Sequence, residues 1–258
     1  MVVLGLMATI AITYAGIRTG LPTHKDEKAP KLANEPKKSI DTVALKVFKQ
    51  VYEQVNPYRE TFELQGTLTI NDGADTTANV KQLPYQYVKR KKSLYFSLGD
   101  TEMLNADGVY ICVDRAQKKI MVGAQKEVIE NNLMPDLNKI IEQLQDENYQ
   151  LTNGDSGKTG LRKVAIVNPT HITCKELTLF YKEETMQPTS LFSRLSNFDD
   201  PLNPKMDKTI LMTVEVANKP SFEQLMTNRI IKKIGKQQYV PASAYNDFEV
   251  VMLNELQK

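Results

Sequence analysis

The sequence predicts an α+β fold in which short antiparallel strands form a curved sheet and amphipathic helices lie against it. Most of the chain after residue 60 alternates apolar and polar residues with a period of two, and Gly, Asn and Asp separate the runs. Three other segments space their apolar residues at helical intervals. Hydrophobic residues make up 41% and charged residues 25% of the 258-residue chain, which is typical of a folded globular protein.

The chain begins with an apolar run at residues 2–17 that contains no charge. No Lys or Arg precedes it, and its length lies between the ~7–15 residues of a signal-peptide core and the ~20 residues of a spanning helix. We predict that residues 1–20 are a cleaved signal peptide or, alternatively, an N-terminal membrane anchor, with a buried helix as a third interpretation. Either of the first two places the remaining chain outside the cytoplasm.

Residues 21–38 contain three Pro, five Lys and three acidic residues without an apolar period, which predicts an extended Pro/Lys linker. The excess of Lys could contact anionic headgroups, whereas a solvated tether is the simpler interpretation. The remaining residues 39–258 are enough for a single domain with its own core.

The first helix is expected over residues 43–55. Ser39 and Asp41 offer capping oxygens before it, its apolar residues form one stripe, and Asn56 and Pro57 stop it. Five short strands with polar turns follow, which predicts an antiparallel meander that is curled or closed into a barrel. These strands are expected at residues 62–70, 80–88, 93–98, 109–113 and 119–122.

A second helix is expected over residues 133–144, with Pro135 in its first turn. A third is expected over residues 221–235, because Ser221 and Gln224 have the spacing of a capping box and Gly235 suits a helix end. The remaining strands are expected at residues 161–167, 172–181, 190–195, 209–216 and 248–253.

Composition excludes several classes of function. The net charge of +2 gives no field that favours nucleic acid. Two Cys and two His cannot form a disulfide scaffold or a four-thiolate zinc site, so we expect no metal and no cofactor. His171 and Cys174 would point to opposite faces of a strand, which favours an ordinary strand over a metal or thiol site. Cys112 and Cys174 could pair in an oxidising compartment or be two small buried hydrophobes.

Residues 152–159 resemble two catalytic motifs without satisfying either. They end in Gly-Lys-Thr like a phosphate-binding loop, but Thr152 stands where the first glycine belongs and a strand pattern follows. They also contain Gly-Asp-Ser-Gly around Ser156, yet the only upstream histidine that could serve as a base is His24, in the linker. A hairpin turn explains the composition. We therefore predict no catalytic residues and a protein that is not an enzyme.

Two sets of charged residues can be interpreted either as solvated turns or as functional sites. The basic run at residues 89–92 is a solvated turn or a contact for headgroups or phosphates. Acidic residues around two turns are solvated, or do acid–base work or bind calcium; these are Asp100, Glu102, Asp107 and Asp114.

The order of elements resembles the LolA/LppX family of periplasmic lipoprotein carriers. The resemblance lies in residues 44–52 (ALKVFKQVY), 62–70 (FELQGTLTI), 95–114 (YFSLGDTEMLNADGVYICVD), 119–122 (KIMV) and 186–191 (MQPTSL). It implies a strongly curved antiparallel sheet, an open half-barrel, with helices packed on its concave face. It also implies a periplasmic location, soluble or tethered to the inner membrane.

The resemblance implies a non-enzymatic carrier or binding module for lipid acyl chains or lipoproteins. A sheet beneath amphipathic helices would enclose an apolar space, and the residues expected to line it are Leu64, Leu68, Ile70, Tyr87, Tyr95, Ile111, Val113, Leu137 and Ile141. The alternative is a membrane-anchored structural or interaction subunit of a cell-envelope assembly with the same fold and a filled cavity. Envelope proteins would then be its partners, and residues 1–20 would contact the membrane.

Overall fold

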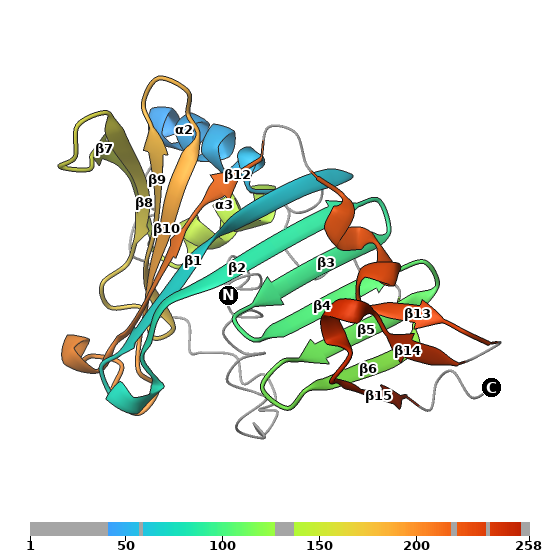
Figure 1. The fold of residues 1–258 in the computed structure, drawn as a ribbon. Coiled ribbons are helices and arrows are strands. Elements are labelled where there is room, and N and C mark those ends of the chain that lie inside the picture. Colours follow the sequence, from blue (N-terminus) through green and yellow to red (C-terminus); the bar gives the residue numbers. More distant parts are fainter. Residues whose placement is uncertain (1–40, 57–58, 127–136, 218–220, 236–237, 254–258) are drawn as a thin grey trace.

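A computed structural model describes residues 41–56, 59–126, 137–217, 221–235 and 238–253 (Figure 1). The helices and strands are, in chain order, α2 (Thr42–Gln54), β1 (Thr61–Asp72), β2 (Val80–Arg90), β3 (Ser93–Leu98), β4 (Thr101–Ala106), β5 (Val109–Asp114), β6 (Lys119–Ala124), α3 (Leu137–Asp146), β7 (Gln150–Asp155), β8 (Leu161–Val167), β9 (Cys174–Lys182), β10 (Pro188–Leu195), β11 (Lys208–Thr213), β12 (Glu215–Val216), β13 (Ile231–Lys233), β14 (Tyr239–Pro241) and β15 (Glu249–Met252).

One open sheet of thirteen strands organises the molecule. Its order is β15-β6-β5-β4-β3-β2-β1-β11-β10-β9-β8-β7, and β12 also pairs with β1. Neighbouring strands are antiparallel, except that β15 lies parallel to β6. The sheet therefore consists of one meander from β1 to β6 and another from β7 to β11, joined where β1 pairs with β11.

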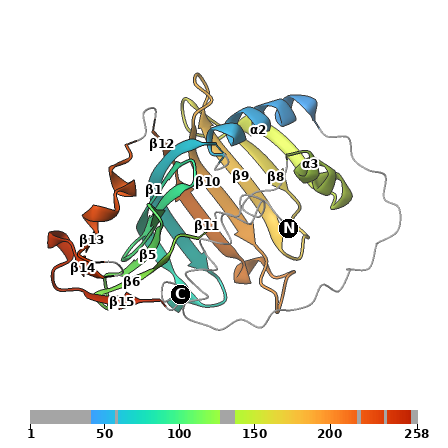
Figure 2. The same ribbon diagram turned by 90° about the vertical axis from the view of Figure 1, so that its right-hand side faces the viewer.

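The two ends of the sheet are covered on opposite faces. Helices α2 and α3 pack over β7, β8 and β9, whereas residues 221–252 pack over β3 to β6 on the other side. Figure 2 shows the helices on the right and the orange-red C-terminal segment on the left. We call the side beneath α2 the helix face and the side beneath residues 221–252 the outer face. Register across the strands shows which side chains share each face.

Helix α2 follows from its cap and its stripe. The Asp41 carboxylate accepts hydrogen bonds from the backbone N–H groups of Val43 (2.8 Å) and Ala44 (3.1 Å), which satisfies two donors of the first turn. Ala44, Phe48, Val51 and Tyr52 are buried against the β7–β9 side chains on the helix face. The cap and helix predicted from the sequence are confirmed.

The C-terminal segment has no α-helix among its described residues. Residues 221–235 form two single 3₁₀ turns, η4 (Glu223–Leu225) and η5 (Thr227–Arg229), and then strand β13. Leu225, Ile230 and Ile231 still reach the core, but they do so from an irregular backbone. Packing onto the sheet has overridden the helical spacing, so the predicted third helix is wrong.

The predicted fold class is also wrong. The described chain is mostly β, with one large mixed sheet and only two α-helices, and it is not an α+β half-barrel with helices packed across a concave face. Both helices lie at the β7–β10 end, and β15 makes the sheet mixed. Strands β4 and β7 were absent from the prediction, because the sequence reads there as polar turns.

Within the described residues, no helix has the length and apolar character needed to cross a bilayer. The expected signal peptide or anchor at residues 1–20 and the linker at residues 21–38 lie outside the described residues.

Candidate functional site

A row of apolar side chains crosses β2 to β6 on the helix face. Its members are register partners on successive strands, and each is half-buried. Strands in a sheet lie about 4.8 Å apart, so the row is roughly 19 Å long. We call it the apolar row; it consists of Tyr87, Phe96, Met103, Cys112 and Met121.

The outer face of the same strands carries a matching row that is sealed. Its members have exposed fractions between 0% and 5% and pack beneath Leu225, Ile230 and Tyr245. This second row is therefore part of the core, whereas the side chains of the apolar row on the helix face remain partly exposed. The sealed row consists of Val88, Tyr95, Leu104, Ile111 and Val122.

The chemistry of the apolar row suits binding rather than catalysis. Thioether side chains adapt to irregular apolar surfaces, and the row contains two of them. The Tyr110 hydroxyl donates a hydrogen bond to the Met103 sulfur (3.3 Å), and the Lys126 ammonium lies 4.5 Å from the Tyr110 ring centre. Burial, with the nearby Asp114 carboxylate, raises the pKa of the Cys112 thiol, so this cysteine remains a neutral, unreactive side chain.

The residues predicted to line a cavity are divided between the two faces. Leu64, Leu68 and Ile70 are buried in a central cluster on the helix face, beside Tyr87 of the apolar row. Tyr95, Ile111 and Val113 lie on the outer face, beneath the C-terminal segment. Ile141 is half-buried in α3, and Leu137 starts that helix with a side chain outside the described set.

Sequence reasoning missed three members of the apolar row, namely Met103, Cys112 and Met121. Alternation within each strand separates the two sets of side chains, but it does not say which set meets the helix face. That assignment needs the register between strands, which depends on the turns.

A buried carboxylate, Glu102 on β4, joins the outer face to the C-terminal segment. It accepts hydrogen bonds from the Tyr245 hydroxyl (2.8 Å) and the Tyr95 hydroxyl (3.0 Å). Arg229 (3.2 Å) and Arg115 pair with the same carboxylate. We call these five residues the Glu102 network. Among the four acidic residues expected in solvated turns, Glu102 is thus the exception, with 3% exposure.

Opposing effects act on the pKa of Glu102. Burial would raise it, but the Tyr245 hydrogen bond and the guanidinium groups of Arg115 and Arg229 together hold it below the ordinary value. Burial raises the pKa of Tyr245 to about 12, so its hydroxyl remains a donor. Every oxygen of this carboxylate is engaged by a side chain, and the arrangement holds two chain segments together. The described part of the chain contains no group of three His, Cys, Asp or Glu that could hold a metal ion.

His171 is engaged by its own loop and by Glu147, which follows α3. Its Nδ1 accepts from the backbone N–H groups of Cys174 (3.1 Å) and Thr173 (3.2 Å), and its Nε2 lies 3.1 Å from the Glu147 carboxylate. Burial raises the pKa of the Cys174 thiol to about 11. The pair therefore does not form an activated thiol. Cys112 and Cys174 are both free thiols, so they do not form a disulfide.

The loop with two catalytic look-alikes is a strand followed by a turn. Its first part belongs to β7, and the Ser156 hydroxyl donates to the Leu161 carbonyl (2.7 Å) and accepts from the Lys158 N–H (3.2 Å). The turn leads into strand β8 rather than a helix, as the sequence predicted.

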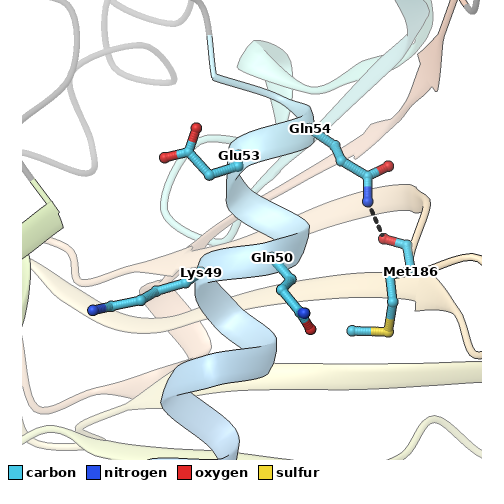
Figure 3. Close-up of a pocket in the computed structure, with 5 residues that line it drawn as sticks. All are labelled: Lys49, Gln50, Glu53, Gln54 and Met186. Carbon is cyan, nitrogen blue, oxygen red and sulfur yellow. Dashed lines mark hydrogen bonds between the residues drawn. The ribbon is translucent and has the colours of Figure 1, made fainter.

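A shallow hollow of about 460 Å³ lies on the outside of α2 (Figure 3). The Gln54 amide donates a hydrogen bond to the Met186 carbonyl (2.9 Å) at its edge. The hollow is wide open, so an acyl chain lying in it would stay largely in contact with water. The lining residues are Lys49, Gln50, Glu53, Gln54 and Met186.

Comparison with known proteins gives structural likeness only. No family model and no curated protein matches the chain. An uncharacterized conserved protein from Thermus thermophilus is similar over 82% of this chain and 99% of its own, with 11% identity and a TM-score of 0.38. The MucA/MucB complex of Pseudomonas aeruginosa is similar over 72% of this chain and 61% of that chain, with 15% identity and a TM-score of 0.38.

The Mycobacterium tuberculosis lipoprotein LppX belongs to the family that the sequence resembles. It is similar over 70% of this chain and 98% of its own, with 10% identity and a TM-score of 0.33. Because these TM-scores lie below 0.5, the likenesses carry no inference about what this chain binds.

Proposed function

We propose that this protein is a non-enzymatic periplasmic carrier or binding module that holds the acyl chain of a lipid or lipoprotein along the apolar row. The observation that carries the proposal is the contrast between the two faces of β2 to β6. One row is sealed by the C-terminal segment, and the other presents half-buried aromatic and sulfur-containing side chains.

The size of the row suits an acyl chain. One leaflet of a bilayer contributes about 15 Å of hydrocarbon, half of the ~30 Å core. The roughly 19 Å row can therefore lie alongside a chain of that length. Each methylene removed from water contributes about 0.8 kcal/mol, so even partial contact along the row provides useful affinity.

The positive charge of Lys126 beside the apolar row would determine the orientation of a bound lipid. This exposed residue lies two positions after the end of β6, and its ammonium lies over the Tyr110 ring on the helix face. An anionic headgroup at this end would meet a positive charge, while the acyl chain extends over Cys112 and Met103. The described residues place no acidic side chain in the row itself.

A fluorescent fatty-acyl probe tests the proposal. We expect the wild-type protein to bind it, and Met103→Asp to weaken binding at least tenfold, because the acyl chain would have to desolvate the new charge. Leu211→Asp, on the outer face and 39% exposed, is the matched control and should bind normally. Thermal unfolding of both variants checks that each is folded at the temperature of the binding measurement. A wild-type protein that binds no acyl probe would contradict the carrier and favour the envelope-assembly subunit.

The periplasmic location rests on residues 1–20 and needs a separate test. A native mass spectrum of protein purified from cells reports both cleavage of this segment and any retained lipid. A cleaved protein with lipid is the result we expect. An uncleaved protein that co-purifies with envelope proteins and carries no lipid would support the alternative.

A further inference from the structure

One end of strands β2 to β6 is rich in exposed cations. The β2–β3 turn, the end of β6 and the β13–β14 hairpin all lie there, on the right in Figure 1. Six exposed cations face three exposed acids, Glu60, Asp107 and Glu223. We call this surface the cationic end; its cations are Arg90, Lys91, Lys92, Lys126, Lys232 and Lys233.

Specific contacts hold the parts of the cationic end together. The Gln125 side chain donates to the Lys92 carbonyl (3.4 Å), which joins the end of β6 to the β2–β3 turn. The Arg90 guanidinium lies 4.8 Å from the Phe222 ring centre, which joins that turn to the C-terminal segment. These contacts hold the loops that carry the cations together as one surface.

Two large apolar side chains stand out from this surface. Ile234 is 63% exposed and Met226 is 56% exposed. Ile234 directly follows Lys232 and Lys233 in the β13–β14 hairpin. The hairpin is anchored by Ile231, which is 3% exposed in the core, and closed by a hydrogen bond from the Ile234 N–H to the Gln238 carbonyl (3.0 Å). An apolar tip beside lysines matches the interface of an anionic bilayer.

The opposite end of strands β2 to β6 carries exposed charges of both signs. It carries the β1–β2, β3–β4, β5–β6 and β10–β11 connections, and Phe198 there is 82% exposed, directly before Asp199 and Asp200. This end therefore lacks the excess of cations found at the cationic end, and the attraction of anionic headgroups favours the cationic end. The exposed acids here are Asp75, Asp100, Asp199 and Asp200, and the exposed cations beside them are Arg115, Lys118, Lys119 and Lys205.

We propose that the cationic end docks on the surface of an anionic lipid bilayer, with Ile234 and Met226 entering the headgroup region. The strands β2 to β6 then stand end-on to the membrane. This contact does not require the apolar row to bind an acyl chain, so it holds or fails independently of the proposed function.

The chain contains no tryptophan, so a single introduced tryptophan is a unique fluorescent reporter. We expect the emission of Ile234→Trp to shift to the blue when phosphatidylglycerol-containing vesicles are added to the full chain. Pure phosphatidylcholine vesicles should give little shift, and high salt should reverse it. Phe198→Trp, at the opposite end, is the matched control and should show no shift. Both sites are exposed, so neither variant should alter thermal unfolding.

Charge reversal gives the second measurement. In the Ile234→Trp background, Lys232→Glu with Lys233→Glu should weaken vesicle binding by at least about tenfold, from the loss of attraction to anionic lipid. Lys119→Glu with Lys205→Glu, at the opposite end, should leave it unchanged. If the protein were instead bound through residues 1–20 inserted in the membrane, the tryptophans at positions 234 and 198 would lie equally close to the vesicle. Equal shifts at positions 234 and 198, equal shifts with both lipids, or no shift at all would overturn the proposal.

Discussion

At the scale of single residues, Glu102 helps to hold the C-terminal segment over the sealed row. Its carboxylate binds Tyr95 from the sheet and Tyr245 and Arg229 from the C-terminal segment. Removing the charge leaves four donors around a weaker acceptor in a buried site. Buried polar groups whose hydrogen bonds are only partly satisfied lower the free energy of unfolding.

We expect Glu102→Gln to lower the free energy of unfolding by about 2–3 kcal/mol, the usual range for losing hydrogen bonds to a buried charged group. Chemical denaturation measures it. Asp100→Asn, an exposed carboxylate two residues away, should change it by less than about 0.5 kcal/mol. Equal effects at the two positions would show that the network contributes nothing specific.

The same carboxylate gives acid sensitivity with a defined sign. Because the folded protein holds the pKa of Glu102 below its unfolded value, its contribution is complete above the unfolded value, near 4.5. The contribution declines as the pH falls through the folded pKa. Wild type should therefore lose more stability than Glu102→Gln between pH 5 and strongly acidic conditions. Parallel pH curves for the two proteins would contradict this.

At the scale of elements, β1 depends on Gly66. Residues on one side of it pair with β12 and residues on the other side pair with β11, so two partner strands meet there. A Cβ at this position would lie 2.0 Å from the Thr213 carbonyl oxygen, which belongs to backbone and cannot swing away. The glycine lets the two meanders join.

Gly66→Ala should therefore cost about 2–4 kcal/mol, because the junction between β1 and β11 must move apart. Gly154→Ala, in β7, is the matched control: a Cβ there meets nothing within 4 Å, and the change should be neutral or slightly stabilising. Thermal melting of both variants checks this. If Gly66→Ala left the melting temperature unchanged, the junction between β1 and β11 would be able to accommodate the added methyl group without loss of stability.

The sequence was most informative where local patterns decide the structure. The capped helix α2 and strands such as β5 and β8 follow from alternation, spacing and turns. It failed where tertiary packing decides: β4 hides the buried polar residues Glu102 and Asn105, so it reads as a turn. Residues 221–235 have helical spacing, but they lie as irregular backbone on the outer face. Most of the apolar row depends on register that no single strand encodes.

At the scale of the whole molecule, the sheet has two peripheral cores on opposite faces. Val51 belongs to the core beneath the helices, and Ile120 belongs to the core beneath the C-terminal segment. A central cluster on β1, β2 and β11 lies between them. Cores that share few side chains can open separately.

We expect Ile120→Ala to speed amide hydrogen exchange in β4 to β6 and β15, with a much smaller effect on α2 and β8. Val51→Ala should give the reverse pattern. Native-state exchange followed by mass spectrometry resolves the two regions. Uniform acceleration throughout the sheet in both variants would show that the molecule opens as one cooperative unit.

The pairing of β15 with β6 also determines when the molecule can finish folding. Tyr245 and Glu102, which meet in the same core, are 143 positions apart in the chain. A ribosome therefore completes the meander β1 to β6 long before it makes the residues that cover it. Contacts with such separation slow folding and prolong the exposure of apolar strands. Until residue 252 emerges, the nascent sheet has two apolar sides, and a chaperone that shields β3 to β6 would protect it from aggregation during this interval.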